Sequence, residues 1–415
     1  MPSTSQDTPD ATVGPVRPLA PFRERRFLAC FATGTLAASG NWMLSLSVPY
    51  LVYELTRSSA WLGVAAVASN LPSLIASPVG GVFADRYAKR TLLLVAGGIQ
   101  VALALVLFAT SRAGLLDIRL LIGLAAAMGF ASATQTSVYQ SFVAEIVQAR
   151  HISAAYRLNA IQFNVSRAIG PAVAGLVLHR FGPTTAFLVN ALSFAPLLCV
   201  LAVIRTRDVQ RSVATSVAGE IVEGALVVWR DHRLRIAVLT GALCSMFGMS
   251  IYSLAAGLAK DVFHVDEAGL GLLVSSIGLM SFLTALLAVS LGDRLRRSTL
   301  VTSGLVLYGL GLQVVAATDV FAVGLLGFGI TGIAHVMVNV SVTTTIQQYV
   351  APEFRGRVTS FQLLGIMLSL PIGAQLGGLA ADFVGLPAVV AAYGGVQIAC
   401  GLWAKLRMGG LREID

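Results

Sequence analysis

Charged residues are scarce in this sequence. Only 12% of its 415 residues are Asp, Glu, Lys or Arg, whereas 56% are hydrophobic, and the mean hydropathy is +0.79. A soluble globule carries about 25% charged residues. The scarcity excludes a soluble domain and indicates a protein that resides in a lipid bilayer.

Cysteine and histidine are rare as well. The chain has four cysteines and five histidines. Their spacing fits no disulfide framework and no metal site, and the sequence contains no HExxH pair, Walker loop or catalytic-triad spacing. We therefore expect no enzyme activity, no metal and no cofactor, and keep a membrane enzyme or receptor only as a third hypothesis.

Long apolar stretches recur along the chain. Each has about 18–25 residues, the length that crosses roughly 30 Å of hydrocarbon. Because lipid offers backbone groups no hydrogen-bond partner, each stretch must form a helix. The sequence thus predicts an all-α membrane protein with twelve transmembrane helices, at 27–53, 60–84, 91–110, 118–143, 157–179, 184–204, 236–259, 268–290, 299–318, 321–347, 357–381 and 385–404.

Lys and Arg are distributed unevenly between the two sides of these spans. Of the 29, 23 fall in segments on the side of both termini, five fall on the other side, and Arg167 lies within a span. The positive-inside rule then predicts a multi-pass protein of the cell membrane with both termini cytoplasmic. Basic inner loops that face an anionic leaflet also account for the net charge of +9, so we expect no nucleic-acid partner.

The sequence repeats itself. Glycines at 129, 170, 175 and 182 recur at 332, 373, 378 and 385, always 203 positions later. Two parallel six-helix halves follow from this offset. In the linker, Ile221, Ala225 and Val228 share one helical face, which predicts a helix at the inner interface. We expect a monomer divided into a disordered cytoplasmic tail (1–25), an N-terminal six-helix bundle (26–205), a cytoplasmic linker (206–235) and a C-terminal six-helix bundle (236–415).

This organisation resembles the major facilitator superfamily of secondary transporters. The stretch GGVFADRYAKR at 80–90 is similar to the family's G-x-x-x-D-R-x-x-R-R loop between spans 2 and 3, and DRLRRS at 293–298 is its second copy. The matching residues are Gly81, Asp85, Arg86, Lys89 and Arg90, with Asp293 and Arg294 in the copy.

Two further motifs extend the resemblance over the chain. RLLIGLAAA at 119–127 is similar to the family's R-x-x-x-G motif in span 4, although Ile122 replaces the usual glutamine. SRAIGPAVAG at 166–175 resembles the span 5 signature of exporters, carried by Gly170, Pro171 and Gly175. Together with the stretch at 40–63, it is most similar to the branch that contains the enterobactin exporter and the macrolide efflux proteins.

The charged loop suggests a latch that closes the cytoplasmic side. Asp85 is expected to meet the N-terminus of span 11, where unpaired N–H groups favour an anion. The neighbouring cations are expected to engage acidic helix ends, with Glu145 as the best partner, while Gly80 and Gly81 permit close helix approach. Alternatively, the charges only orient the protein. The remaining gating candidates are Arg86, Lys89, Arg90, Asp293, Arg294 and Arg355.

A polar stripe runs down span 10, where His335, Asn339 and Thr343 recur every four residues. In the resembled fold, spans 1, 4, 7 and 10 line a central cavity. The stripe then forms a cargo site or, alternatively, makes hydrogen bonds that hold neighbouring helices together. From the other three spans, the predicted lining adds Asn41, Trp42, Ser45, Ser132, Thr136, Gln140, Ser245, Met249 and Tyr252. Aromatic and Met side chains beside amides suit a bulky, partly apolar cargo.

Acidic residues are missing from the interior of every span, which removes the usual proton carrier of an antiporter. His335 remains a candidate because its ordinary pKa suits neutral pH, and Glu54, Asp382 and Asp85 are the others. Arg167 lies within span 5, where it must find water or partners such as Asn164 or the carbonyls freed by Pro171. A structural role and a substrate role remain open for it.

Three functions fit these features to different degrees. The favoured one is a secondary active exporter of an amphipathic small molecule, such as a drug, siderophore or secondary metabolite, that works by alternating access and proton antiport. A lipid or lysolipid translocator, or an uncoupled facilitator, is the alternative. A lipid translocator predicts a lateral opening between spans. A membrane enzyme or receptor is the third hypothesis. The favoured function implies three partners, which are a small-molecule substrate, the proton gradient and the lipid bilayer.

Overall fold

The computed structural model describes residues 19–204, 217–291, 297–351 and 353–407. The described residues contain helices and no strands. The predicted tail residues 1–18, the linker residues 206–216, and Asp293 and Arg294 lie outside them, and nothing of the Asp85 side chain is described. A 3₁₀ helix at Ala20–Arg23 precedes the first long helix, which begins at Arg25.

The N-terminal half consists of six membrane-crossing segments. α6 crosses twice, because its backbone leaves helical geometry at Gly182, where φ is 78°. A φ in this region favours glycine, which has no Cβ to clash. Span 2 is divided into α2 and α3 at Pro72, which has no N–H to donate. The helices are α1 (Arg25–Thr56), α2 (Ser59–Asn70), α3 (Ser73–Arg86), α4 (Lys89–Arg112), α5 (Ile118–Ile146) and α6 (Ile152–Val203).

The C-terminal half repeats this plan. Gly385, the counterpart of Gly182, has φ 84° and separates α13 from α14. Span 7 is interrupted by two π-helical turns, at Ser245–Met249 and Leu258–Val262, although its sequence predicts one continuous helix. The helices are α8 (His232–Cys244), α9 (Ile251–Gly257), α10 (Glu267–Leu291), α11 (Arg297–Ala316), α12 (Phe321–Tyr349), α13 (Arg355–Val384) and α14 (Leu386–Arg407).

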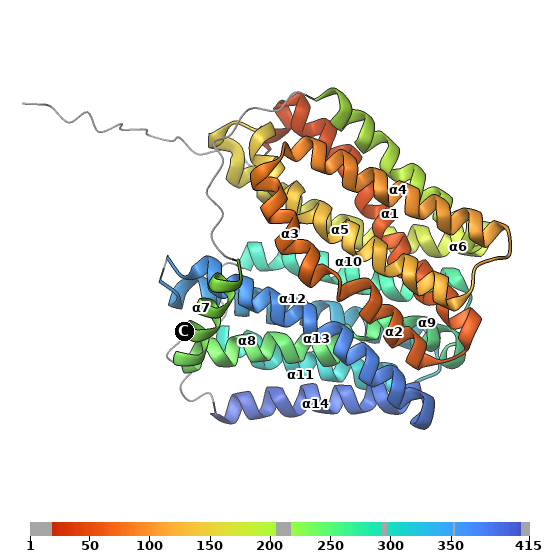
Figure 1. Cartoon of the computed structure of the whole chain (residues 1–415). Helices are drawn as coiled ribbons and strands as arrows, with labels where there is room; N and C mark the ends of the chain where they lie inside the picture. The colour runs from red at the N-terminus through yellow and green to blue at the C-terminus, as the bar shows by residue number, and fades with distance from the viewer. Residues whose placement is uncertain (1–18, 205–216, 292–296, 352, 408–415) are drawn as a thin grey trace, which may run out of the picture.

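Twelve crossings in two six-helix halves are therefore confirmed. Ten stretches of the described residues are long and apolar enough to span a membrane, and one of them contains both crossings of α6. α1, with 32 residues, is long enough but less apolar. Figure 1 shows the N-terminal half, coloured red to yellow-green, stacked on the C-terminal half, coloured green to blue.

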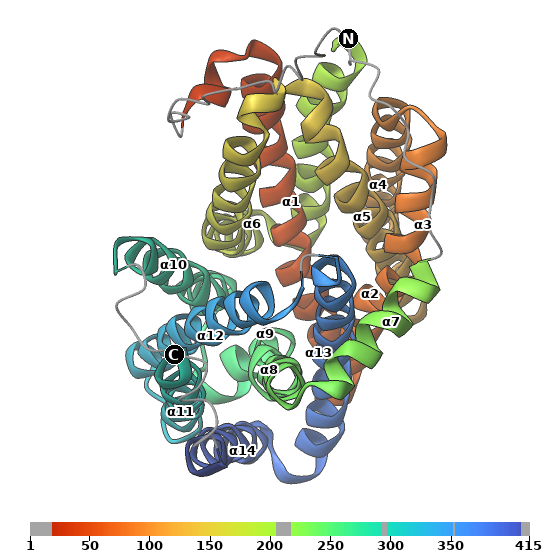
Figure 2. The same ribbon diagram turned by 90° about the vertical axis from the view of Figure 1, so that its left-hand side faces the viewer.

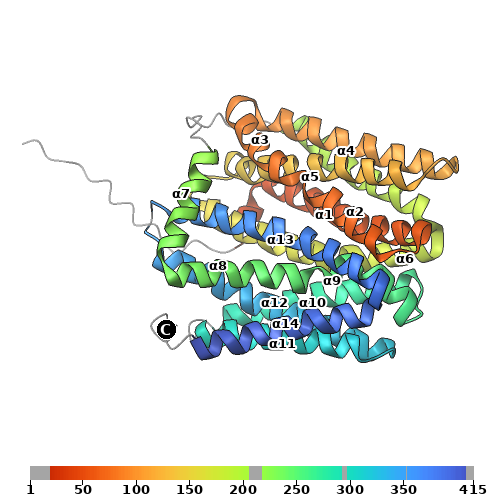
Figure 3. The ribbon, with the colours of Figure 1, turned by 60° about the horizontal axis from the view of Figure 1, so that its bottom comes forward.

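The two ends of the bundle differ in what they hold. We call the end where α1 begins and α14 ends the terminal end, and the opposite end the distal end. The linker helix α7 (Val217–Arg230) crosses the terminal end at a steep angle to the bundle, as Figure 3 shows. Val228 is buried on it, whereas Val222, Leu226 and Trp229 are exposed, as expected for a helix at a membrane interface.

The halves meet along two helix pairs, α2 with α13 and α6 with α10, which lie side by side in Figure 2. Small residues permit the approach. A Cβ added to Gly175 would lie 2.8 Å from the Cα of Gly271, and one added to Gly278 would lie 2.6 Å from the carbonyl oxygen of Arg167. The span 5 motif therefore packs one half against the other, and its Gly170 packs against α1 at Trp42.

Candidate functional site

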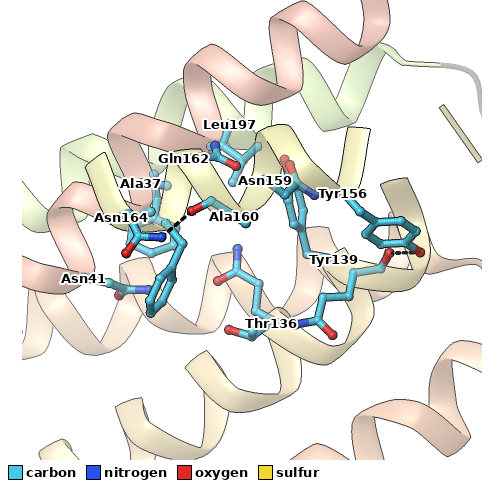
Figure 4. Close-up of a pocket in the computed structure, with 16 residues that line it drawn as sticks. Ala37, Asn41, Thr136, Tyr139, Tyr156, Asn159, Ala160, Gln162, Asn164 and Leu197 are labelled. Atoms are coloured by element: carbon cyan, nitrogen blue, oxygen red, sulfur yellow. Dashed lines mark hydrogen bonds between the residues drawn. The ribbon is translucent and has the colours of Figure 1, made fainter. Parts of the chain in front are cut away.

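The larger cavity lies inside the N-terminal half, between α1, α5 and α6, and has a volume of about 640 Å³. Amide and aromatic side chains dominate its wall, and none of the lining residues is charged. Figure 4 shows Asn41, Thr136 and Asn164 around the same space. The full lining is Gly34, Ala37, Ala38, Asn41, Gln135, Thr136, Tyr139, Gln140, Tyr156, Asn159, Ala160, Gln162, Phe163, Asn164, Phe194 and Leu197.

Some polar groups in this wall have partners in the protein and others do not. Gln162 donates to the carbonyl oxygen of Phe31 over 2.8 Å, and Asn164 donates to that of Ala160. The buried Oδ1 of Asn159 has no hydrogen-bond partner among the described residues. Because a buried acceptor is costly to leave unsatisfied, Asn159 favours a ligand or a water that donates to it.

A second cavity, of about 290 Å³, lies between the halves. Asn41 lines both cavities, and its Nδ2 lies 3.4 Å from the hydroxyl of Ser132. This cavity also has no charged residue in its lining. Six of the predicted cargo residues line it, four from the N-terminal half and two from the C-terminal half: Asn41, Trp42, Ser45, Ser132, Met249 and Tyr252.

Arg167 lies behind the wall of the second cavity, with only 6% of its surface exposed. Its Nε and Nη2 donate to the Tyr252 hydroxyl over 2.9 and 2.7 Å, and its guanidinium lies over the rings of Trp42 and Tyr252. Neither Asn164 nor a carbonyl freed by Pro171 is its partner in any described contact. That expectation is wrong because Asn164 donates to Ala160 within its own helix, and α6 stays helical through Pro171.

The contacts of Arg167 are neutral, which is unusual for a buried cation. A charged side chain at the centre of a spanning helix costs about 2.5–3.5 kcal/mol on insertion scales, unless partners offset the cost. Here the offset comes from a hydroxyl, from two aromatic faces and from the Sδ of Met249, 3.7 Å from Nη2. Since Tyr252 and Met249 belong to the other half, these contacts also link the two halves.

The polar stripe on α12 does not meet the other predicted cargo residues. Asn339 Nδ2 lies 3.1 Å from both the ring Nε2 and the carbonyl oxygen of His335, whose ring packs edge-on against Tyr308. Thr343 is exposed, and Ser245 is buried in the first π-helical turn. None of these four predicted residues lines either cavity. Thr136 and Gln140 of α5 line the larger cavity.

Polar contacts join the halves at the distal end, and we call them the distal seam. The Asp382 carboxylate of α13 accepts from Ser58 Oγ at 2.6 Å, from the Ser59 amide at 2.7 Å and from the Ala60 amide at 3.3 Å. An anion thus sits at the N-terminus of α2, where the helix dipole favours it. The other links are Tyr50–Glu267, Tyr53–Asp261, Glu54–Lys260 and His179–Asp266.

The terminal end holds ion pairs of a different kind. Lys89 Nζ lies 2.8 Å from Glu145, and both belong to the N-terminal half. Arg90 donates to the carbonyl oxygens of Leu201 and Ala202, again within that half. Arg357 lies 2.7 Å from Glu223 and so fixes the linker helix to α13. Arg86 is exposed, and Arg355 donates to the carbonyl oxygen of Val350.

The expected close helix packing is found at Gly80 and not at Gly81. A Cβ added to Gly80 would lie 3.2 Å from the Cα of Thr134 in α5. A Cβ added to Gly81 would meet no atom within 4 Å. Successive residues of a helix point about 100° apart, so only one of the two glycines faces α5.

Several residues of the site were missed by sequence reasoning. Tyr156, Asn159 and Phe163 line the larger cavity from α6, and their spacing places them on one helical face. That spacing is a usable signal. No sequence signal identified Tyr50 and Tyr53 of the distal seam, because their partners lie more than 200 residues away.

Comparisons with known proteins agree with this geometry. A family model described as transmembrane secretion effector matches residues 16–413. The multidrug efflux pump Tap of Mycobacterium tuberculosis (strain ATCC 25618 / H37Rv) is 26% identical over 413 residues, which cover 94% of each protein. Macrolide efflux protein A of Streptococcus pyogenes is 22% identical over 368 residues, 87% of this chain and 90% of that protein.

Among solved structures, a bacterial homologue of the human lysosomal transporter Spinster, in an inward-facing and occupied conformation, has a TM-score of 0.75 to this chain. The match covers 93% of this chain and 97% of that one at 14% identity. At this identity the likeness concerns the fold.

Proposed function

This chain belongs to the transmembrane secretion effectors, a family of major facilitator superfamily transporters, and on that premise we propose that it exports an amphipathic small molecule by alternating access. The observation that carries the proposal is a cavity lined by both halves. Six of the predicted cargo residues line it, four from the N-terminal half and two from the C-terminal half. A rocking motion of the halves would therefore change the cavity's access.

The distal seam supports the direction of transport. We propose that the terminal end is cytoplasmic, because 23 of the 29 Lys and Arg residues lie on its side. The structure then corresponds to the state that receives cargo from the cytoplasm. Opening the distal seam would release the cargo outside, and the contacts of Asp382 would be broken and remade in each cycle.

Proton antiport is the proposed source of energy. Glu54 and Asp382 already hold a cation and a helix N-terminus across the seam, so both act as gate residues rather than proton carriers. The third candidate, Asp85, is assigned to the cytoplasmic latch. His335 remains, a titratable group within α12 that is bound to Asn339. We assign proton coupling to His335.

Everted membrane vesicles test the export proposal. Vesicles that contain this protein and acidify their lumen should accumulate a fluorescent amphiphile, and a protonophore should abolish the accumulation. Uptake that a protonophore leaves unchanged would favour the uncoupled facilitator. Transfer of a lysolipid between leaflets, with no uptake of soluble amphiphiles, would favour the lipid translocator.

The role of His335 has its own test. His335→Gln should abolish gradient-driven accumulation but retain exchange of labelled for unlabelled cargo, because exchange needs no net proton movement. Asn339→Ser, which removes the hydrogen-bonding partner and no titratable group, is the matched control and should keep accumulation within about twofold. Normal gradient-driven accumulation by His335→Gln would exclude the assignment.

A further inference from the structure

Arg167 is a buried cation whose described partners are all uncharged. Its guanidinium contacts the Tyr252 hydroxyl, the Met249 thioether and the ring faces of Tyr252 and Trp42. Buried charges in proteins are usually paired with an opposite charge. The described residues give Arg167 no carboxylate partner, so one negative charge is missing from its surroundings.

The residues that shield Arg167 are also the wall of the second cavity. Trp42, Met249 and Tyr252 all line that space. The wall itself carries no charge, and the guanidinium of Arg167, which contacts three of its residues, is a source of positive potential beside the cavity. A positive potential in a cavity lined by low-dielectric groups attracts anions and repels cations.

Tyr252 presents this charge to the cavity. Its hydroxyl oxygen accepts two hydrogen bonds from Arg167, and the described residues offer the hydroxyl hydrogen no acceptor. The adjacent guanidinium polarises the O–H group and strengthens it as a donor. An anionic oxygen in the cavity would accept this hydrogen and gain the charge of Arg167 behind it, which is a charge-assisted hydrogen bond.

We propose that the exported molecule is an amphipathic anion, with a carboxylate or sulfonate against the Tyr252 hydroxyl and its apolar part against Trp42 and Met249. This inference rests on the proposed function and names the class of cargo. Arg167 and Tyr252 belong to different halves, so an anion bound to the Tyr252 hydroxyl strengthens a contact between the halves. The contact between Arg167 and Tyr252 therefore takes part both in binding the anion and in the movement of the two halves. Arg167 determines the specificity for the charge of the cargo.

Three matched probes test the proposal. Each has a dansyl group on a ten-carbon chain that ends in a sulfonate, a primary amide or a trimethylammonium group. Binding to the purified protein in lipid nanodiscs is measured by fluorescence, and uptake is measured in energised everted vesicles. The wild type should bind the sulfonate about tenfold more tightly than the amide, and the trimethylammonium probe least.

Variants locate the effect. Arg167→Gln should lower the affinity for the sulfonate by about tenfold and leave that for the amide within about twofold. Tyr252→Phe should act in the same direction, and Arg167→Lys should keep part of the preference. Arg180→Gln removes an exposed cation from the same helix and is the matched control, with no effect on either probe. Size-exclusion profiles confirm that each variant is folded.

The outcomes separate this proposal from the proposed function. Uptake of the amide or trimethylammonium probe without a preference for the sulfonate would overturn the anion site and leave the exporter standing. An equal loss of all three probes in Arg167→Gln would overturn a role in charge selection and assign Arg167 to packing. If no probe is bound or taken up by the wild type, both proposals fail.

Discussion

The two ends of the molecule use the same two spans in different ways. At the distal end, Asp382 near the end of α13 binds the N-terminus of α2, so span 11 holds the start of span 2. At the terminal end, the sequence predicts the reverse arrangement, with Asp85 at the end of α3 and the start of α13 as its target. The described pairs there, Lys89–Glu145 and Glu223–Arg357, do not join the two halves.

This difference shows which contacts join the halves in this structure. A carboxylate at a helix N-terminus is a modest contact, worth about 1 kcal/mol. The polar contacts of the distal seam join the halves, and each can break without unfolding a helix. We predict the same kind of contact at the terminal end through Asp85, so that small differences in free energy would decide which end is closed.

The largest expected effect comes from separating α6 from α10. In Gly175→Ala, the new Cβ would lie 2.8 Å from the Cα of Gly271 and 2.6 Å from the carbonyl oxygen of Glu267. Backbone must shift to make room, so we expect a loss of about 1–3 kcal/mol for the distal-closed state and of most transport. Thermal unfolding and vesicle uptake measure the two effects.

Gly98→Ala in α4 is the control for this prediction, because a Cβ there meets nothing within 4 Å. It should be neutral or stabilising by about 0.5–1 kcal/mol, the usual helix preference of Ala over Gly. If the two variants behave alike, close packing of α6 on α10 does not hold the distal end closed.

The next largest effect should come from Asp382→Ala. Removing the carboxylate leaves the Ser59 and Ala60 amides without their partner, at a cost of about 1 kcal/mol, or roughly a fivefold shift toward the open distal end. Labelling of a cysteine introduced at the seam, in a background without the four native cysteines, reports the shift. Unchanged labelling would show that Asp382 does not hold the seam.

Asp117→Ala is the matched variant for Asp382→Ala. Asp117 caps α5 by accepting from the Leu120 amide over 2.8 Å, and both residues lie in the same half. Its loss should cost a similar free energy of unfolding without increasing the labelling of the seam. The pair of variants thus separates a cap that links halves from a cap that only stabilises a helix.

The smallest effect on the distal seam is expected from a change at the terminal end. Lys89→Gln removes an ion pair in which the Lys89 and Glu145 side chains are only 17% and 11% exposed. The change leaves a mostly buried carboxylate without its partner, which should lower the thermal stability of the N-terminal half. Because the pair does not join the halves, seam labelling should stay unchanged. A large rise in seam labelling would show that the two ends are coupled through Lys89.

Much of the fold could be predicted from the sequence, because lipid imposes helix formation on each apolar stretch. Gly182 and Gly385 even reveal the point at which both halves turn, and the structure gives both a positive φ. The π-helical turns of span 7 left no trace in its hydropathy. They depend on side-chain packing, which a periodic pattern does not encode.

The candidate site was less predictable than the fold. Spans 1 and 4 and the Met249–Tyr252 region were identified because polar residues in an apolar helix attract notice. The partner of Arg167 was not identified. Tyr252 lies 85 residues away in the other half, and the two residues come into contact only when the halves pack together. Likewise, the regular spacing of His335 and Asn339 suggested cargo contacts, whereas the two side chains contact each other.

Alternating access is the central claim, and paired spin labels test it most directly. One pair, at exposed Leu115 and Val320, reports the distance between the halves at the distal end, and another, at Val203 and Ala351, reports it at the terminal end. The account predicts that cargo and a proton gradient lengthen the distal distance while they shorten the terminal one. Distances that lengthen together, or that never change, would contradict it.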